Sequence, residues 1–148
     1  MIRTTIYQTL AQDPELAKML APATPEMGIG DNPGIYETWA GEAAPMPYIN
    51  LTYEFYAGDH PIKRQGALNV DLFFDGYDTT RGEAIANRII QLLDHVMLED
   101  PDEGGIRIYL DDELTIPTDE ENISHWNITF TIISWRRSFI AARTEWKL

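Results

Sequence analysis

Three segments of the sequence alternate apolar and polar residues with a period of two, and this pattern constrains the fold more than any other feature. They cover residues 47–56, 67–75 and 125–135. Successive side chains of a β-strand point to opposite faces of a sheet, so each segment predicts a strand with one buried face. Weaker patterns predict two further strands, at residues 34–39 and 106–110. The residues expected on the buried faces of the three long strands are Ile49, Leu51, Tyr53, Phe55, Leu68, Val70, Leu72, Phe74, Trp126, Ile128, Phe130 and Ile132.

The clearest helical pattern begins at Thr80, because Thr80 and Glu83 have the spacing of a capping box. A second helical pattern covers the first 20 residues and breaks near residue 12. There Asp13 and Pro14 are predicted to form an N-cap and a first-position proline. The apolar stripe of the clearer helix is predicted to comprise Ile85, Ile89, Leu92, Leu93 and Val96.

The predicted order of elements is helix, three strands, helix and two strands, without the repeated strand-helix-strand rhythm of a parallel sheet. The length of 148 residues is that of one ordinary domain. We therefore expect an α+β fold in which residues 1–148 form a single domain. Its sheet should be mostly antiparallel, with four to five strands and two main helices packed on one face.

Several stretches are predicted to lie outside these elements. Residues 21–34 are rich in proline and glycine, which predicts a long loop that we expect to be mobile in the isolated protein. Residues 100–105 are predicted to form a turn, and the acidic residues between 111 and 121 are interpreted as solvent-facing loop residues. Residues 137–148 form a predicted C-terminal tail.

Charge is unevenly distributed along the chain, whose formal net charge is −13. This charge disfavours binding to nucleic acid through its phosphates, which requires a basic surface. Between residues 94 and 121 eleven acidic residues accompany the single Arg107, whereas residues 136–148 hold four basic residues and one acidic residue. The segregation suggests two unlike surfaces that meet between copies of the chain.

The candidate chemical groups form no recognisable catalytic pattern. His60, His95 and His125 are not at metal-ligand spacing, and the run DLFFDGYD lacks the spacing of a calcium loop. No serine lies in a nucleophile elbow, and the chain has no cysteine. We therefore expect no metal, no cofactor and no enzymatic activity. The N-terminus lacks an apolar signal core and no segment is long enough for a membrane helix, which favours a cytoplasmic protein without membrane contact.

Tryptophans at positions 126, 135 and 146 fall in the last quarter of the chain, beside the basic tail. The last two lie at or beyond the end of the final predicted strand, where a small domain has little interior left to bury them. Aromatic and arginine side chains are enriched at protein interfaces. The candidate subunit-interface residues are Trp135, Arg136, Arg137, Arg143 and Trp146.

Four motifs occur together in a characteristic order. The first helical pattern ends in LAQDPELAKML, Pro47 and Tyr48 open the first long strand, and HWNITFTIISWR closes the fold. Between them lies the strand-turn-helix run GALNVDLFFDGYDTTRGEAIANRIIQLLD. In these motifs the chain resembles the bacteriophage tail-terminator proteins, also called tail completion or tail-to-head joining proteins. The resemblance spans nearly the whole chain and rests on apolar positions and turn residues.

The resemblance implies a small α+β subunit that forms a ring, hexameric in that family, at the head-proximal end of a long phage tail. The ring would end polymerisation of the tail tube and join the tail to the head while DNA passes through its lumen. Its partners would be further copies of the chain, the tail-tube protein and a head-completion or connector protein, with DNA as cargo that is not bound specifically. The protein would reside in the virion and, during assembly, in the host cytoplasm. An acidic lumen would not bind phosphate, and the candidate residues that face the lumen or a partner are Asp111, Asp112, Glu113, Asp119, Glu120 and Glu121.

Other functions remain open at this point. Another neck ring protein or a tail-tube subunit would share the ring, although a tube subunit needs a long hairpin, for which residues 58–66 are a modest candidate. A small binding module would use residues 21–34 as a lid. An acidic DNA mimic would bind a nuclease or DNA-binding protein with an affinity that falls steeply as salt rises.

Overall fold

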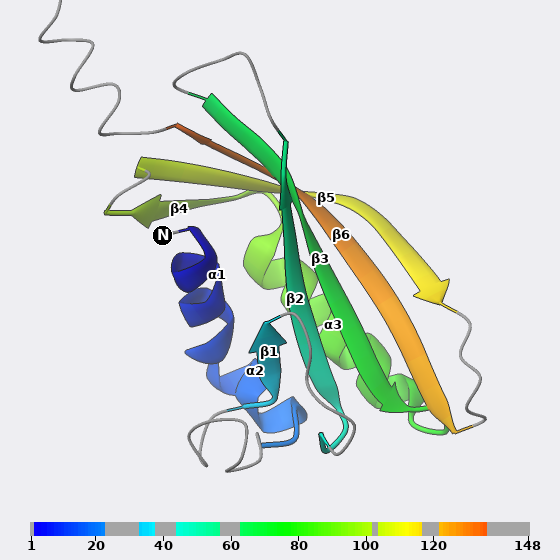
Figure 1. The fold of residues 1–148 in the computed structure, drawn as a ribbon. Coiled ribbons are helices and arrows are strands. Elements are labelled where there is room, and N and C mark those ends of the chain that lie inside the picture. Colours follow the sequence, from blue (N-terminus) through cyan, green and yellow to red (C-terminus); the bar gives the residue numbers. More distant parts are fainter. Residues whose placement is uncertain are drawn as a thin grey trace, which may run out of the picture.

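One six-stranded sheet and three helices make up the described part of the chain in the computed structural model (Figure 1). The described residues are 2–22, 33–37, 44–56, 63–101, 104–116 and 122–135. The strand order is β1-β2-β3-β6-β5-β4, and all neighbouring strands are antiparallel except the parallel pair β1 and β2. The predicted α+β class is confirmed, and the sheet has one strand more than the four to five predicted. The elements are α1 (Ile2–Ala11), α2 (Pro14–Met19), β1 (Ile35–Glu37), β2 (Tyr48–Phe55), β3 (Lys63–Asp75), α3 (Thr79–Leu93), β4 (Val96–Asp100), β5 (Gly104–Ile116) and β6 (Ile123–Trp135).

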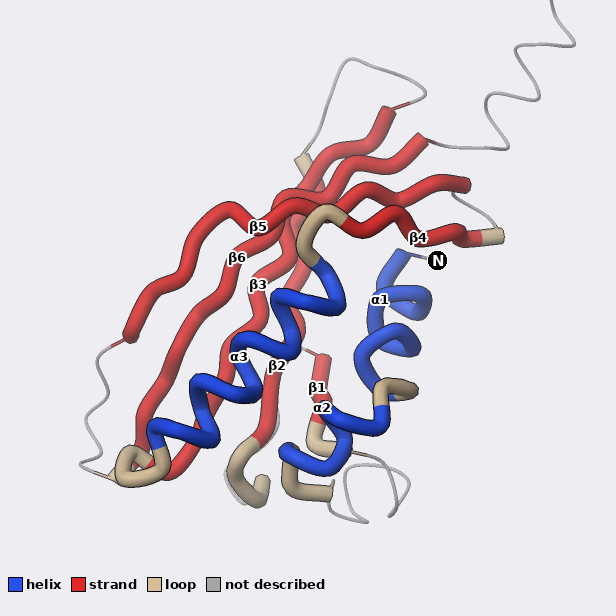
Figure 2. The backbone as a smooth tube through the Cα atoms, turned by 180° about the vertical axis from the view of Figure 1, so that it is seen from behind, coloured by secondary structure: helices blue, strands red, loops and turns tan. Residues whose placement is uncertain are grey.

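All three helices lie on the same face of the sheet, as opposite views of the chain show (Figures 1 and 2). The predicted alternation explains this arrangement, because the alternate apolar residues predicted for one face of β3 and β6 point to the helices and are buried, Trp126 only in part. They are Leu68, Val70, Leu72, Phe74, Trp126, Ile128, Phe130 and Ile132. Each fully buried side chain of this size contributes roughly 1.5–3 kcal/mol through removal of apolar surface from water. The helical and strand residues with no exposed surface include Ile6, Leu10, Ile85, Ile89, Leu93, Leu68, Val70, Leu72, Phe130 and Ile132.

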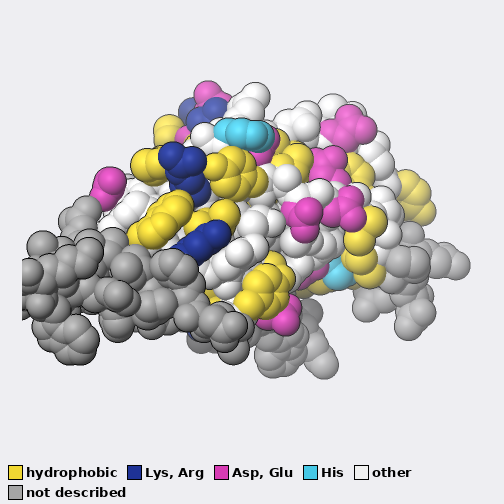
Figure 3. Space-filling model, turned by 90° about the horizontal axis from the view of Figure 1, so that it is seen from above, with side chains coloured by type: hydrophobic (Ala, Val, Ile, Leu, Met, Phe, Trp, Pro, Cys, Tyr) yellow, Lys and Arg dark blue, Asp and Glu magenta, His cyan; other side chains and the backbone are white. Residues whose placement is uncertain are grey.

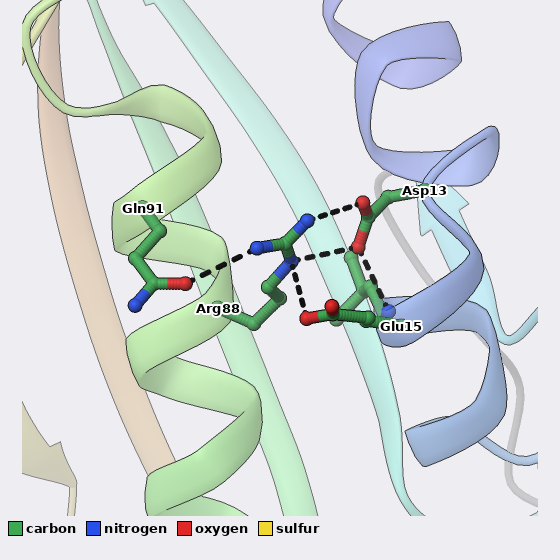
Figure 4. A network of polar contacts seen from close by, with 5 residues as sticks. Asp13, Glu15, Arg88 and Gln91 are labelled. Atoms are coloured by element: carbon green, nitrogen blue, oxygen red, sulfur yellow. Dashed lines mark hydrogen bonds and ion pairs between the residues drawn. The ribbon is translucent and has the colours of Figure 1, made fainter.

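Asp13 joins the predicted helix break to α3 (Figure 4). Its Oδ2 accepts a hydrogen bond from the backbone N–H of Leu16 at 2.9 Å, which confirms Asp13 as the N-cap of α2, with Pro14 at the first helical position. Arg88 of α3 donates to both carboxylate oxygens, at 2.6 Å to Oδ1 and 2.9 Å to Oδ2. The Arg88 guanidinium holds the pKa of the buried Asp13 carboxyl below its usual value. One side chain thus starts α2 and fixes it against α3.

The start of α3 differs from the predicted capping box. The helix begins at Thr79, so Thr80 lies inside its first turn, and Asp78 occupies the N-cap position without a side-chain cap hydrogen bond. The preceding turn sets this start, because the Asp75 carboxylate accepts from the N–H of Tyr77 at 3.0 Å and the Asp75 carbonyl accepts from the N–H of Asp78 at 2.9 Å. Hydrogen bonds of the turn therefore outweigh the spacing of Thr80 and Glu83.

The end of α3 also differs from the prediction, which placed Val96 on the helical stripe. The helix ends at Leu93, His95 has a left-handed φ of 56°, and Val96 begins β4, a strand that the sequence patterns did not predict. The Asp94 carboxylate accepts from the backbone N–H of Leu110 in β5 at 2.8 Å, and this bond lowers the pKa of Asp94. The turn is thus fixed by a contact with a strand that follows it in sequence.

Strand β5 is longer than the predicted strand at 106–110. It continues to Ile116, so Asp111, Asp112 and Glu113 lie on a strand and not on the predicted loop. Strand β6 has the same length of 13 residues and supplies pairing partners from Ile106 to Ile116, except at Asp111. A register shift between Leu110 and Asp112 interrupts the alternation, which is why the sequence pattern hid the second half of the strand.

Several predicted features lie wholly or partly outside the described residues. Pro22 and Pro33 form an isolated antiparallel bridge that brings together the two ends of the predicted loop 21–34, whose residues 23–32 are not described. The predicted tail 137–148 is not described either. Within the described part of the chain, no helix has the length and apolar character needed to cross a membrane.

Candidate assembly surfaces

The face of the sheet opposite the helices carries a hydrogen-bonded polar cluster. It forms because the polar residues of β3 and β6 alternate with the core residues and face one another in register, Asp71 opposite Asn127 and Asn69 opposite Thr129. Asn127 Nδ2 donates to Asp71 Oδ1 at 3.0 Å, and Thr129 Oγ1 donates to Asn127 Oδ1 at 2.8 Å. His125 Nε2 lies 2.7 Å from the same Asp71 oxygen. The cluster holds these half-buried side chains in fixed positions without a covering helix.

An aromatic row crosses four strands beside this cluster. Tyr36 of β1 meets the ring of Tyr48 edge-on, with centroids 5.6 Å apart. Tyr48 stacks on Phe73 at 5.0 Å, and Phe73 stacks on His125 at 4.1 Å. His125 therefore belongs to both the aromatic row and the polar cluster, and its side chain is only 19% exposed. The result is a face whose side chains are already ordered, which lowers the entropic cost of contact with a partner.

The pairing of His125 with Asp71 was not predicted, although both residues occupy polar positions of strands that were predicted. The arrangement supplies an imidazole beside a carboxylate, which in a catalytic site would orient the histidine toward a nucleophile. Instead of a nucleophile, Asn127 contacts the Asp71 carboxylate, and the ring of Phe73 stacks on His125. No cluster of three histidine or acidic side chains that could hold a metal ion occurs among the described residues. The described geometry thus fits a structural role of this pair.

A groove of about 400 Å³ lies on the other side of the sheet, between the first half of α3 and the ends of β5 and β6. Its apolar part includes Ile128 and Trp126, whose ring packs edge-on against Phe74 with centroids 4.7 Å apart. The acidic residues Glu83 and Glu113 line the same groove. All of its lining residues are Glu83, Ala86, Asn87, Glu113, Leu114, Thr115, Trp126, Asn127 and Ile128.

The predicted site residues fall into described and undescribed groups. Trp135 lies at the end of β6 and is 36% exposed. Asp111, Asp112 and Glu113 are exposed on β5, so the structure brings these three together on one strand. Their proposed contact with a lumen or partner, and the interface role of Trp135, stay predictions. The residues outside the described part are Arg136, Arg137, Arg143, Trp146, Asp119, Glu120 and Glu121.

The surface also segregates charge. Seen from above, acidic side chains gather on one part of the surface, whereas lysine and arginine side chains lie among hydrophobic ones on another part (Figure 3). Two of the basic residues, Arg3 and Arg64, lie over the rings of Tyr53 and Phe55, at 5.2 and 3.9 Å from the ring centroids. The described surface therefore offers regions of unlike chemistry to a partner.

The fold is shared with proteins of known structure. A chain from the virion of a native gene transfer agent particle matches with a TM-score of 0.69 and 14% sequence identity, over 90% of this chain and 94% of that chain. A second solved structure matches with a TM-score of 0.61 and 16% identity, over 91% of this chain and 93% of that chain. No protein-family model matches the sequence, and no curated protein matches it. At these identities the similarity shows a common fold that covers almost the full length of each chain.

Proposed function

We propose that this chain is a structural virion protein of a phage or phage-like particle, a ring-forming subunit at the head-proximal end of the tail. The observation that carries the proposal is the match, over almost the full length of both chains, with a chain from a gene transfer agent virion. The motifs that resemble tail-terminator proteins support the more specific position in the tail. In this role the ring ends growth of the tail tube and presents a surface to the head.

The described surfaces support a role in assembly. A closed ring joins two different patches of each subunit, so a ring subunit needs two unlike surfaces. Here the uncovered sheet face carries the ordered polar cluster and aromatic row, and the opposite side of the sheet carries the groove with Glu83 and Glu113. Neither surface repeats the chemistry of the other, which favours a head-to-tail contact over a two-fold symmetric one.

The proposed partners follow from the same role. They are further copies of this chain, the tail-tube protein on one side of the ring and a head-completion or connector protein on the other. DNA passes as cargo through the lumen. A net charge of −13 for each subunit suits such passage, because an acidic surface repels phosphate groups.

The proposal is tested by the solution mass of the purified protein and by electron microscopy of the protein added to tails. The expected species has a mass of about 101 kDa, six copies of 16.9 kDa, and appears as a ring with a central hole. Tails assembled without the protein should be irregular in length and should regain a uniform length when it is added. A monomer that neither caps tails nor changes their length would refute the proposal.

The same microscopy separates related ring proteins. A tail-tube subunit would form stacks of many rings, and a head-completion protein would bind the head connector in the absence of tails. A tail terminator forms a single ring that binds the end of the tube. The position of the ring therefore identifies the role among the proteins of the neck.

A further inference from the structure

We infer that the groove between α3 and the ends of β5 and β6 binds the basic C-terminal segment, residues 136–148, of a neighbouring copy of the chain. This inference rests on the proposed ring and names the contact that closes it. The residues that line the groove include the acidic Glu83 and Glu113. The segment 136–148 holds four basic residues and one acidic residue. The two surfaces are therefore complementary in charge.

The apolar part of the groove complements the same segment. Trp126 and Ile128 line it, and Trp126 is only partly buried, so the groove offers aromatic surface that water now contacts. The segment supplies Phe139, Ile140 and Trp146 between and after its basic residues. Burial of one such side chain contributes roughly 1.5–3 kcal/mol, which exceeds the contribution of an exposed ion pair. Apolar contacts would thus give affinity, and the charges would set the orientation.

The geometry of β6 favours a neighbouring copy as the source of the segment. The groove is lined by Trp126, near the start of β6, and the segment follows Trp135, at the other end of that strand. Figure 1 shows the long, extended course of β6. Trp126 and Trp135 are nine positions apart, or roughly 30 Å along an extended strand. A segment of 13 residues spans at most about 45 Å, so a return to its own groove would use most of its length. In a head-to-tail ring the far end of one subunit lies beside the near end of the next, and the whole segment is available for contact.

Cross-linking between full-length copies tests the contact directly, because the chain has no cysteine of its own. One copy carries Asn87→Cys in the groove, and a second, distinguished by a size tag, carries Ser138→Cys in the segment. A short bismaleimide should join the two copies with a yield about tenfold higher than for a matched pair in which Glu54→Cys, on exposed β2 surface, replaces Asn87→Cys. Equal yields would overturn the inference. A further variant carries both substitutions in one chain. Cross-links that form within this chain, with none between separate copies, would also overturn the inference.

Charge reversal provides the second test. Glu83→Lys with Glu113→Lys should weaken self-association about tenfold, and Arg137→Glu with Arg143→Glu in the same chain should restore it. The control Glu54→Lys should leave association unchanged. Rings that form normally with the reversed groove, and that give no cross-link from position 87 to 138, would overturn this contact and leave the proposed function intact. Failure of the unaltered protein to form rings or cap tails would instead remove the proposed function itself.

Discussion

At the scale of single residues, Asp13 is a polar side chain that joins two helices of the helical layer. It is buried, caps α2 through the N–H of Leu16, and accepts two hydrogen bonds from Arg88. A buried carboxylate is stable only with such partners, because loss of one partner leaves a desolvated charge without compensation. The attachment of α2 to α3 therefore depends on this pair.

Replacement of Arg88 by alanine should lower the free energy of unfolding more than replacement of an exposed arginine does, because it leaves the Asp13 carboxylate without its cation. Equilibrium urea unfolding measures this loss. Arg81→Ala is the matched control, since Arg81 also joins α3 to the end of α2 but donates to the carbonyl of Met19 from an exposed position. An Arg88→Ala loss no larger than that of the control would contradict the proposed importance of the pair.

The same pair predicts a dependence of stability on pH. The pKa of Asp13 is lower in the folded protein than in the unfolded chain, so its contribution is fully present above the unfolded pKa of about 3.9. As pH falls through the lower folded pKa, Asp13 binds a proton and the contribution is lost. Urea unfolding between pH 6 and about pH 2 should show this loss in the unaltered protein and a smaller loss in Arg88→Ala. Parallel curves for the two proteins would contradict the assignment.

Gly82 of α3 has a steric reason to be glycine. A Cβ atom at this position would lie 2.6 Å from ring carbons of Phe74, which is buried in the core. Gly82→Ala should therefore lower the free energy of unfolding by about 1–2 kcal/mol, although alanine favours a helix. Thermal unfolding measures the change. Gly105→Ala is the control, because the nearest atom to its new Cβ is Met97 Sδ at 3.9 Å, and a loss there as large as at Gly82 would contradict the steric explanation.

Sequence patterns predicted some of these residues and not others, for a physical reason. Asp13 followed by Pro14 is a local signal, since the cap bonds a residue three positions away, and the prediction is confirmed. Arg88 lies 75 positions from Asp13, and His125 lies 54 positions from Asp71. Contacts of this kind depend on how the strands and helices are placed, which a periodic pattern does not specify.

At the scale of elements, the first half of β5 has a strand on both sides, whereas its second half is an edge of the sheet. Strand β4 pairs with it as far as Ile108, and among the described residues no strand pairs with the outer side of β5 beyond that point. This second half carries Asp111, Asp112 and Glu113. Charged residues on an edge strand oppose its pairing with the edge of another molecule. The acidic residues thus have a role in solubility in addition to any role in the ring.

Removal of the acidic residues from the edge of β5 should cause the protein to aggregate. Asp111→Thr with Asp112→Val removes two of the three edge charges and strengthens the strand propensity of the edge, so light scattering should show aggregates at concentrations where the unaltered protein gives none. The matched control removes the same formal charge at exposed positions away from β5 and the groove, by Asp78→Asn with Glu54→Gln. Equal aggregation of both variants would mean that net charge, and not the edge, keeps the protein dispersed.

The predicted strands succeeded where one face was regularly apolar and failed where it was not. The patterns of β2, β3 and β6 were clear because their alternation is uninterrupted, and their buried residues are confirmed with Tyr53, Phe55 and Trp126 only partly buried. Strand β4 has exposed residues at Met97 and Glu99 and only one fully buried residue, Asp100, so it lacks an apolar stripe. Its formation depends on pairing with β5 and not on its own pattern.

At the scale of the whole molecule, two adjacent acidic residues of β5 lie on opposite faces of the sheet, Asp112 on the uncovered face and Glu113 on the helical face. Asp112 pairs with Thr129, whose side chain belongs to the polar cluster on the uncovered face of the sheet. Glu113 pairs with Ile128, which is buried on the helical face, and lines the groove. If the groove meets the neighbouring subunit, the uncovered face and Asp112 are left for the lumen or for another partner. If the uncovered face lines the lumen, Asp112 is one of the acidic residues expected beside the DNA.

Charge reversal on the uncovered face tests this arrangement. Asp111→Lys with Asp112→Lys keeps a charged edge on β5, so folding and solubility should be preserved. The new cations would bind phosphates of the passing duplex, and we expect DNA delivery by the assembled particles to fall about tenfold while tail length and ring attachment stay normal. Asp111→Asn with Asp112→Asn is the control and should have a smaller effect, because it removes repulsion without adding attraction. Normal delivery by particles with the lysine variant, with rings visible on their tails, would show that these residues face away from the DNA.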